Sequence, residues 1–303
     1  RRANKMNTFK TFVLMFALIL LFLWVGQMIA GKEGMITAFA IACIMNFIAY
    51  WFSDKIVLAM YGARQITEVE KPRLYSLIAN LSQSASIPMP KIYIMNTLTP
   101  NAFATGRNPE HSAVAITTGI LDILSDRELA GVIAHELSHI KNRDTLISVV
   151  AATIAGAIFM IARMAQMAMF FGGFGSRDDR EGRGGALSGL AMVVIMILAP
   201  IAAMIIQLAI SRSREYFADE SAARLTGEPL SLADALSKLA EGVRRRPLDA
   251  NPATAHMFIV NPVRSGGSSV GGLGAGLLTL FSTHPPISER IRRLENLARQ
   301  IGY

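Results

Sequence analysis

Two long apolar runs open the chain, and two more follow in its middle. Residues 9–30 are interrupted only by Lys10, and residues 34–52 carry no charged side chain. Residues 146–162 and 186–210 repeat this pattern. A helix needs roughly 20 apolar residues to cross the hydrocarbon core of a bilayer. The pattern therefore predicts four membrane-spanning helices, arranged as two hairpins.

Basic residues gather on one side of these four segments, which predicts their orientation. Lysine and arginine near the ends of membrane helices concentrate on the cytoplasmic side. On the opposite side, the loop between the third and fourth runs has arginines that neighbouring acids balance. This places both termini and residues 53–145 in the cytoplasm. The residues concerned are Arg1, Arg2, Lys5, Lys10, Lys55, Arg64, Lys141, Arg143, Arg212 and Arg214.

The runs divide the chain into four parts. Residues 1–52 are predicted to form an N-terminal transmembrane hairpin, and residues 146–210 a second one. Residues 53–145 and 211–303 are then two cytoplasmic parts. The expected fold class is mainly α, with four transmembrane helices and a cytoplasmic α+β domain.

The first cytoplasmic part contains short β-like pieces separated by turn-rich stretches. Residues 91–95, 102–105 and 113–117 are rich in β-branched and apolar side chains, and the intervening residues are rich in Pro, Gly and Asn. Such a pattern is typical of short strands joined by turns. It predicts a small antiparallel sheet.

Helix signals surround these strands. Pro72 sits at a first-turn position of a helix that ends before Pro88. Ser125 followed by Glu128 has the spacing of a capping box, and predicts a helix to about Lys141. Further helices are expected over residues 211–225 and 231–246 and from Pro286 onward. The last one is expected to carry a basic face of Arg290, Arg292, Arg293 and Arg299.

Composition agrees with a membrane protein. Of 303 residues, 52% are hydrophobic and 17% charged, below the quarter or so that soluble domains carry. The net charge of +8 is not arranged as a basic stripe with interleaved aromatics, so no nucleic-acid partner is expected. The single cysteine, Cys43, excludes an intramolecular disulfide and a cysteine-based zinc site.

The helix that begins near Ser125 carries His135, Glu136 and His139. Histidines four residues apart share one helical face, so both imidazoles can bind one Zn²⁺. Glu136, beside the first histidine, is placed to take a proton from a water molecule. The sequence therefore predicts a catalytic zinc site.

A catalytic zinc needs a third protein ligand, and several residues compete for that role. His111, His256 and His284 are the remaining histidines; the first two are expected to be structural or surface residues. Glu215 is the best carboxylate, and Asp219 shares its helical face. Asp219 can accept the outer ring N–H of a ligand histidine. A solvated charged face remains the competing interpretation of this helix.

Three motifs in this order resemble the HtpX membrane proteases, a bacterial family related to the CAAX prenyl proteases. They are His-Glu-Leu-Ser-His at 135–139, Arg-Glu-Tyr-Phe-Ala-Asp at 214–219, and Thr-His-Pro-Pro at 283–286 followed by Arg290. The resemblance covers nearly the whole chain from Met6. It implies a zincin-like (gluzincin) domain with one Zn²⁺ per chain.

The resemblance also implies roles for individual residues. Glu215 would be the third zinc ligand and Glu136 the general base, with Asp219 behind the ligands. His284 would assist the oxyanion, supported by Arg290. The implied protein is an endopeptidase of the bacterial inner membrane, in contact with lipids and acting on misfolded membrane proteins.

A substrate strand is expected to pair with the edge of the small sheet, with little side-chain selectivity. The residues of this edge are Asn101, Ala102, Phe103, Ala104 and Thr105. A membrane scaffold or chaperone with a structural zinc is the alternative, but such a site has no need of Glu136. A transporter using Arg163 and Pro200 is disfavoured, because the spans carry few polar residues.

Overall fold

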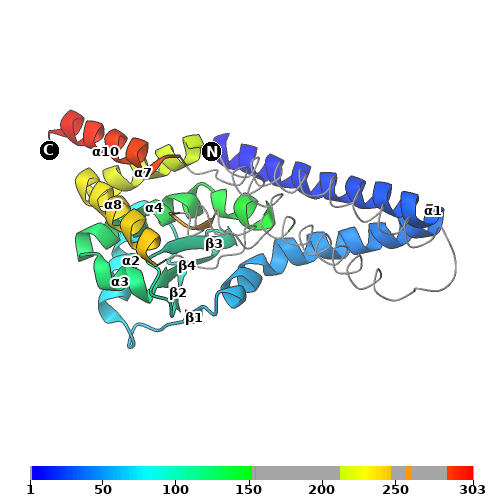
Figure 1. Cartoon of the computed structure of the whole chain (residues 1–303), viewed down its shortest axis with the longest axis horizontal. Helices are drawn as coiled ribbons and strands as arrows, with labels where there is room; N and C mark the ends of the chain where they lie inside the picture. The colour runs from blue at the N-terminus through cyan, green and yellow to red at the C-terminus, as the bar shows by residue number, and fades with distance from the viewer. Residues whose placement is uncertain (1, 152–153, 155–211, 247–256, 261–284, 303) are drawn as a thin grey trace, which may run out of the picture.

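The computed structural model describes residues 2–151, 154, 212–246, 257–260 and 285–302. Figure 1 shows α1 extending from one end of a domain in which helices surround a small sheet. The elements, in chain order, are α1 (Arg2–Met60), β1 (Arg64–Gln65), α2 (Pro72–Ala85), β2 (Lys91–Met95), β3 (Ala102–Asn108), β4 (His111–Thr117), α3 (Thr118–Ile123), α4 (Asp126–Lys141), α7 (Arg212–Thr226), α8 (Pro229–Arg245) and α10 (Ile287–Ile301).

Helix α1 doubles back on itself, so that two arms run beside each other (Figure 1). Gly31 has a φ of 58°, which glycine adopts without steric cost. The arms approach closely, because a Cβ at Gly26 would lie 2.4 Å from the carbonyl oxygen of Gly34. The Nδ2 of Asn46 donates to the carbonyl of Met15 at 3.0 Å, which joins the two arms.

Within the described residues, one stretch has the length and composition to cross a membrane. It is Gly31–Phe52, with 22 residues and a mean hydropathy of 1.9. The first arm contains a shorter apolar stretch, Phe9–Trp24. The third and fourth predicted spans lie outside the described residues, except for residues 146–151 and 154.

In the part of the chain that the structure describes, the strands form one four-stranded sheet in the order β1-β2-β4-β3. The strand predicted over residues 91–95 is β2, with the same bounds. The other two predicted strands are also present, but β3 and β4 extend further than predicted, over Ala102–Asn108 and His111–Thr117. The two-residue β1 was not predicted, since so short a segment has no visible periodicity.

The sheet is mixed, so the prediction of an antiparallel sheet is wrong. β3 and β4 pair antiparallel, but β2 and β4 pair parallel, with Lys91 opposite Ala113 and Met95 opposite Thr117. The chain reverses direction twice between β2 and β4, so the two strands run the same way. β4 lies between β2 and β3, which leaves β3 at the edge of the sheet.

The two faces of the sheet pack against different helices. Phe103 on β3 points to a cluster that includes Val57 and Leu58 from the end of α1. Ala104, the next residue on the strand, points to the main core, which includes Ile78 of α2 and Ile133 of α4. Successive side chains on a strand alternate between its faces, so β3 contacts both layers.

Helix α4 is fixed at its start by a capping box, as predicted. Ser125 Oγ accepts from the backbone N–H of Glu128 at 3.4 Å, and the Glu128 carboxylate accepts from the N–H of Ser125 at 2.8 Å. Lys238 of α8 binds the same carboxylate at 2.7 Å. A Cβ at Gly131 would lie 3.1 Å from Leu232, so α4 and α8 pack closely.

The helices predicted between residues 53 and 145 and between residues 211 and 303 are present as α2, α4, α7, α8 and α10. The short α3 was not predicted. The expected basic face of α10 is wrong at Arg290, whose side chain is 1% exposed. Arg292, Arg293 and Arg299 are exposed. Helical periodicity places Arg290 beside Leu294 and Leu297, so it faces the core rather than the solvent.

Candidate metal centre

Helix α4 places His135 and His139 side by side. Their Nε2 atoms are 3.1 Å apart, as expected for residues one turn apart on the same face. His135 is buried and His139 is partly buried. Both rings therefore present the same nitrogen to a shared point inside the protein.

Glu215 reaches this point from α7. Its Oε1 is 3.5 Å from His139 Nε2, and its Oε2 is 3.6 Å from His135 Nε2. Donor atoms about 2.1 Å from a tetrahedral ion lie roughly 3.4 Å from one another. The three observed distances, two of which end on different oxygens of Glu215, are close to this value. One donor atom from each residue lies within 4.8 Å of the other two, so the three side chains are close enough together to hold one metal ion.

Each histidine is held on its outer nitrogen by an aspartate. The Nδ1 of His135 is 2.9 Å from Asp219 Oδ1, and the Nδ1 of His139 is 3.1 Å from Asp144 Oδ2. A carboxylate that accepts the Nδ1–H leaves the Nε2 lone pair for a metal. Asp219 was anticipated from its helical face. Asp144 was not, because it follows the end of α4.

Arg290 lies directly behind Asp219. Its Nε and Nη2 donate to the two carboxylate oxygens at 2.8 and 2.6 Å. Its Nη1 donates to the carbonyl of Ile259 at 3.0 Å and lies 3.9 Å from Glu215 Oε2. The structure therefore places Arg290 against Asp219, while His284, which it was expected to support, lies outside the described residues.

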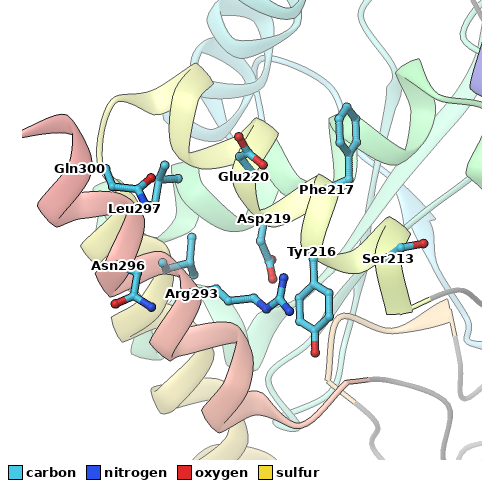
Figure 2. A pocket seen from close by; sticks show the side chains of 10 residues that line it. Ser213, Tyr216, Phe217, Asp219, Glu220, Arg293, Asn296, Leu297 and Gln300 are labelled. Carbon is cyan, nitrogen blue, oxygen red and sulfur yellow. The ribbon is translucent and has the colours of Figure 1, made fainter.

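Helices α7 and α10 lie side by side at this point, with a groove of about 470 Å³ between them. Figure 2 shows Asp219 near the centre of this groove, with Arg293 and Tyr216 facing one another. The guanidinium carbon of Arg293 is 3.8 Å from the centre of the Tyr216 ring, a cation–π contact. This packing brings Arg290 of α10 to Asp219 of α7.

The charges of the site match a divalent cation. Four carboxylates and two guanidinium groups come together around the two imidazoles, which leaves two negative charges uncompensated. Buried charges are normally paired or bind a metal. The carboxylates are Glu136, Asp144, Glu215 and Asp219, and the guanidinium groups are Arg214 and Arg290.

The pKa values of the histidines show the same need for positive charge. Burial disfavours the charged form of His135, but Asp219 and Glu215 outweigh it and raise its pKa to about 9. Burial also opposes protonation of His139, whose pKa is nevertheless raised by Glu215 and Asp144. The surrounding carboxylates therefore favour positive charge at both imidazoles.

The pKa values of Glu136 and Asp219 are shifted in opposite directions. Burial raises the pKa of Glu136, with partial opposition from the two imidazoles. Burial would also raise the pKa of Asp219, but Arg290 outweighs it and holds this pKa below its ordinary value. Arg290 thus favours the ionised form of Asp219, whereas burial favours the protonated form of Glu136.

Glu136 joins the helix to the edge strand. Its side chain is buried, and its Oε2 accepts from the backbone N–H of Ala104 at 2.8 Å. This bond points the N–H of Ala104 away from β4. Since the N–H and C=O of one residue lie on the same side of a strand, the Ala104 carbonyl also faces the outer edge.

The rest of the predicted substrate strand is partly covered. The Nδ2 of Asn101 donates to the carbonyl of Val260, and the N–H of Ile259 donates to the carbonyl of Ala102. At the other end, Thr145 Oγ1 donates to the carbonyl of Gly106. Phe103 and Thr105 are buried. The edge at Ala104 thus lies between two covered stretches.

The other histidines fall elsewhere. His111 is exposed at the start of β4, with its Nδ1 2.8 Å from Asn108 Oδ1, as expected for a surface residue. His256 and His284 lie outside the described residues. Asp144 and Arg214 were not predicted as parts of the site. The only available signal was the position of Asp144 just after the helix that carries both histidines.

Comparisons with known proteins identify the family of this chain. The model of Peptidase family M48 matches residues 68–298. The chain is 57% identical over 295 residues to the "Protease HtpX homolog" of Thermodesulfovibrio yellowstonii, covering 97% of this chain and 100% of that protein. It is 52% identical over 294 residues to the "Protease HtpX homolog" of Pyrococcus furiosus, covering 97% and 96%.

A solved structure shares the fold. The crystal structure of S. mikatae Ste24p matches with a TM-score of 0.51 and 17% identity, over 97% of this chain and 67% of that one. With the sequence matches, the class of protein is clear: this chain is a metalloprotease. It belongs to peptidase family M48, and its relatives are HtpX proteases, so the predicted resemblance is confirmed.

Proposed function

We propose that this chain is a zinc-dependent endopeptidase of the bacterial inner membrane that cleaves misfolded or damaged membrane proteins on the cytoplasmic side. The observation that carries the proposal is the convergence of His135, His139 and Glu215, whose donor atoms lie within 4.8 Å of one another. The buried carboxylate of Glu136 beside them supports catalysis rather than a structural site. Two nitrogens and one oxygen with an open fourth position are typical of catalytic zinc.

Each residue has a definite task in this proposal. His135, His139 and Glu215 would hold the ion, and Asp219 and Asp144 would keep both Nδ1 atoms protonated. The chemistry supplied by a bound Zn²⁺ is Lewis acidity toward the scissile carbonyl and a lowered pKa of water. Glu136 takes the proton of the attacking water on its carboxylate and passes it to the leaving amine.

Further groups act around this centre. The N–H of Ala104 orients the Glu136 carboxylate through its Oε2. By family resemblance, His284 donates a hydrogen bond to the developing oxyanion. Arg290 supports the site through Asp219, which it holds with two hydrogen bonds. A group that binds the oxyanion acts mainly in the transition state, when charge develops there.

The substrate is proposed to bind as a strand beside β3, over Asn101, Ala102, Phe103, Ala104 and Thr105. The Ala104 carbonyl faces the outer edge and would accept a hydrogen bond from a backbone N–H of the substrate. Ile259 and Thr145 already bind the edge on either side, at Ala102 and Gly106. Pairing would therefore be short and centred on Ala104, next to Glu136.

Residues 1–52 and 146–210 are proposed as transmembrane hairpins in contact with lipid. Residues 53–145 and 211–303 are proposed as the two cytoplasmic parts of the catalytic domain. The ligands support this division, because α4 belongs to the first part and α7 to the second, and both contribute to one site. The two parts must then lie on the same side of the bilayer, which requires an even number of crossings between them.

The alternative is a membrane scaffold or chaperone in which zinc is structural. The carboxylate of Glu136, which is 2% exposed and lies beside both histidines, favours an enzyme. A structural site would gain nothing from a buried acid at this position.

One experiment tests the proposal. Membrane vesicles with the cytoplasmic face outward are incubated with casein, using wild type, Glu136→Gln and, as a matched control, Glu241→Gln on the exposed face of α8. Glu136→Gln should keep its zinc and lose activity by a factor of about 10²–10⁴. The control should cleave like wild type. Equal activity of Glu136→Gln, or cleavage only with the opposite face outward, contradicts the proposal.

A further inference from the structure

Behind each of the two histidines, an aspartate and then an arginine follow in contact with one another. In the first of these two chains of residues, Arg290 contacts Asp219, which contacts His135. In the second, Arg214 contacts Asp144, which contacts His139. In the first, the sequence predicted a role for Asp219 behind a ligand histidine, whereas its contact with Arg290 comes from the structure. In the second, neither Asp144 nor Arg214 was predicted to take part.

The second chain is assembled by an unusual turn. α4 ends at Lys141, Asn142 caps it, and Arg143 takes a φ of 56°. A residue with a large side chain seldom occupies this left-handed region. Such backbone strain often occurs at functional sites. The turn ends α4 and places Asp144, the next residue, against the outer nitrogen of His139.

Arg214 approaches from the first turn of α7. Its Nη1 is 3.6 Å from Asp144 Oδ1, and both of its Nη atoms are buried without a hydrogen bond to any described residue. Its neighbour in the chain is Glu215, the candidate third ligand. One turn of α7 therefore brings to the site both a metal ligand and a cation that faces Asp144.

We propose that Asp144 is a positioning residue for His139, and that Arg214 holds Asp144 in place. This rests on the proposed metalloprotease function. Asp144 accepts the Nδ1–H of His139, so that Nε2 keeps its lone pair directed at the ion. The contacts are looser than those around His135, where Arg290 holds Asp219 at 2.6 and 2.8 Å. Loss of Asp144 should therefore weaken metal binding less than loss of Asp219.

The test measures metal binding separately from activity. The full-length chain in detergent is titrated with Zn²⁺ against a chromophoric chelator, using Asp144→Ala, Asp144→Glu, Arg214→Gln and Asp219→Ala. Loss of an outer partner of a metal-binding histidine typically weakens affinity by about 10–100-fold. Asp144→Ala should fall in this range and Asp219→Ala should exceed it, whereas Asp144→Glu should recover part of the loss. Arg214→Gln should give a smaller weakening than Asp144→Ala.

Two further measurements separate positioning from a general effect on folding. Cobalt substituted for zinc should give a changed visible spectrum in Asp144→Ala, because the geometry at His139 changes. Asp234→Ala, an exposed acid on α8, should bind zinc like wild type. Unchanged zinc affinity in Asp144→Ala overturns the proposal, as does equal weakening in the alanine and glutamate variants. If Asp144→Ala fails to fold, the zinc affinity of Arg214→Gln is the deciding measurement. An affinity equal to that of wild type then counts against the proposal.

Failure of the positioning role can be told apart from failure of the proposed metalloprotease function. If wild type binds no stoichiometric zinc, or if His139→Ala binds it equally well, the metal site itself is wrong. If both behave as expected while the Asp144 and Arg214 variants match wild type, only the positioning role is wrong.

Discussion

Replacing Arg290 tests how the domain is held together behind the metal site. The side chain is 1% exposed, donates twice to Asp219, and also binds the carbonyl of Ile259. Methionine at this position fills much of the same space but removes the guanidinium group that pairs with the buried Asp219 carboxylate. Removing one partner of such a buried pair costs about 3–5 kcal/mol.

This cost should appear directly as a lower melting temperature. A loss of 1 kcal/mol lowers the melting temperature of a domain of this size by roughly 2–4 °C, so Arg290→Met should melt roughly 6–20 °C below wild type. Thermal unfolding is followed in detergent after treatment with a chelator, because bound metal adds its own stabilisation. Arg290→Lys keeps the charge but loses the two-point contact, and should lose less.

The matched control removes both charges. In Arg290→Met/Asp219→Asn no unpaired carboxylate remains, so the double variant should be more stable than the single one by about 1–2 kcal/mol. The reasoning is refuted if the single and double variants melt at the same temperature. It is also refuted if Arg290→Met melts within about 2 °C of wild type.

Lowering the pH should reduce the difference in melting temperature between Arg290→Met and wild type. In wild type, the pKa of Asp219 lies below its ordinary value, so its stabilising contribution is present above the unfolded pKa and is lost as pH falls through the folded pKa. In the variant, burial without Arg290 should raise this pKa above that of the unfolded chain. Protonation then favours the folded variant, and the gap in melting temperature should be smaller at pH 5 than at pH 7.

Two more predictions concern protons and substrate. Because Asp219 and Glu215 raise the pKa of His135 to about 9 from 6.5 despite burial, its contribution to metal-free stability is complete below pH 6.5 and is lost as pH rises through 9. Zinc must displace that proton; chelator competition should show tighter binding from pH 7 to 9, and a pH-independent affinity contradicts the assignment. Methylating the substrate amide that pairs with the Ala104 carbonyl should lower kcat/KM roughly tenfold, for one lost hydrogen bond. Methylation of the adjacent amide, which points away from β3, is the control, and equal effects of the two peptides contradict the pairing.

The family and the local structure were predictable from the sequence because both depend on short-range patterns. The spacing of His135 and His139, the capping box at Ser125 and the apolar runs each involve residues within a few helical turns. Helical geometry is the same wherever the helix lies, so these features can be read without knowing the fold. The family followed from motifs that keep their order along the chain.

Only the tertiary structure decided what meets across long separations in the chain. The parallel pairing of β2 with β4, the burial of Arg290 against Asp219, and the contact of Ala104 with Glu136 join segments with no common periodicity. Asp144 is close to His139 in the chain, yet its role depends on the left-handed turn at Arg143. Local patterns determine which face of an element is apolar. Which segments cover that face, and which charges then lie together, is set by packing of the whole domain.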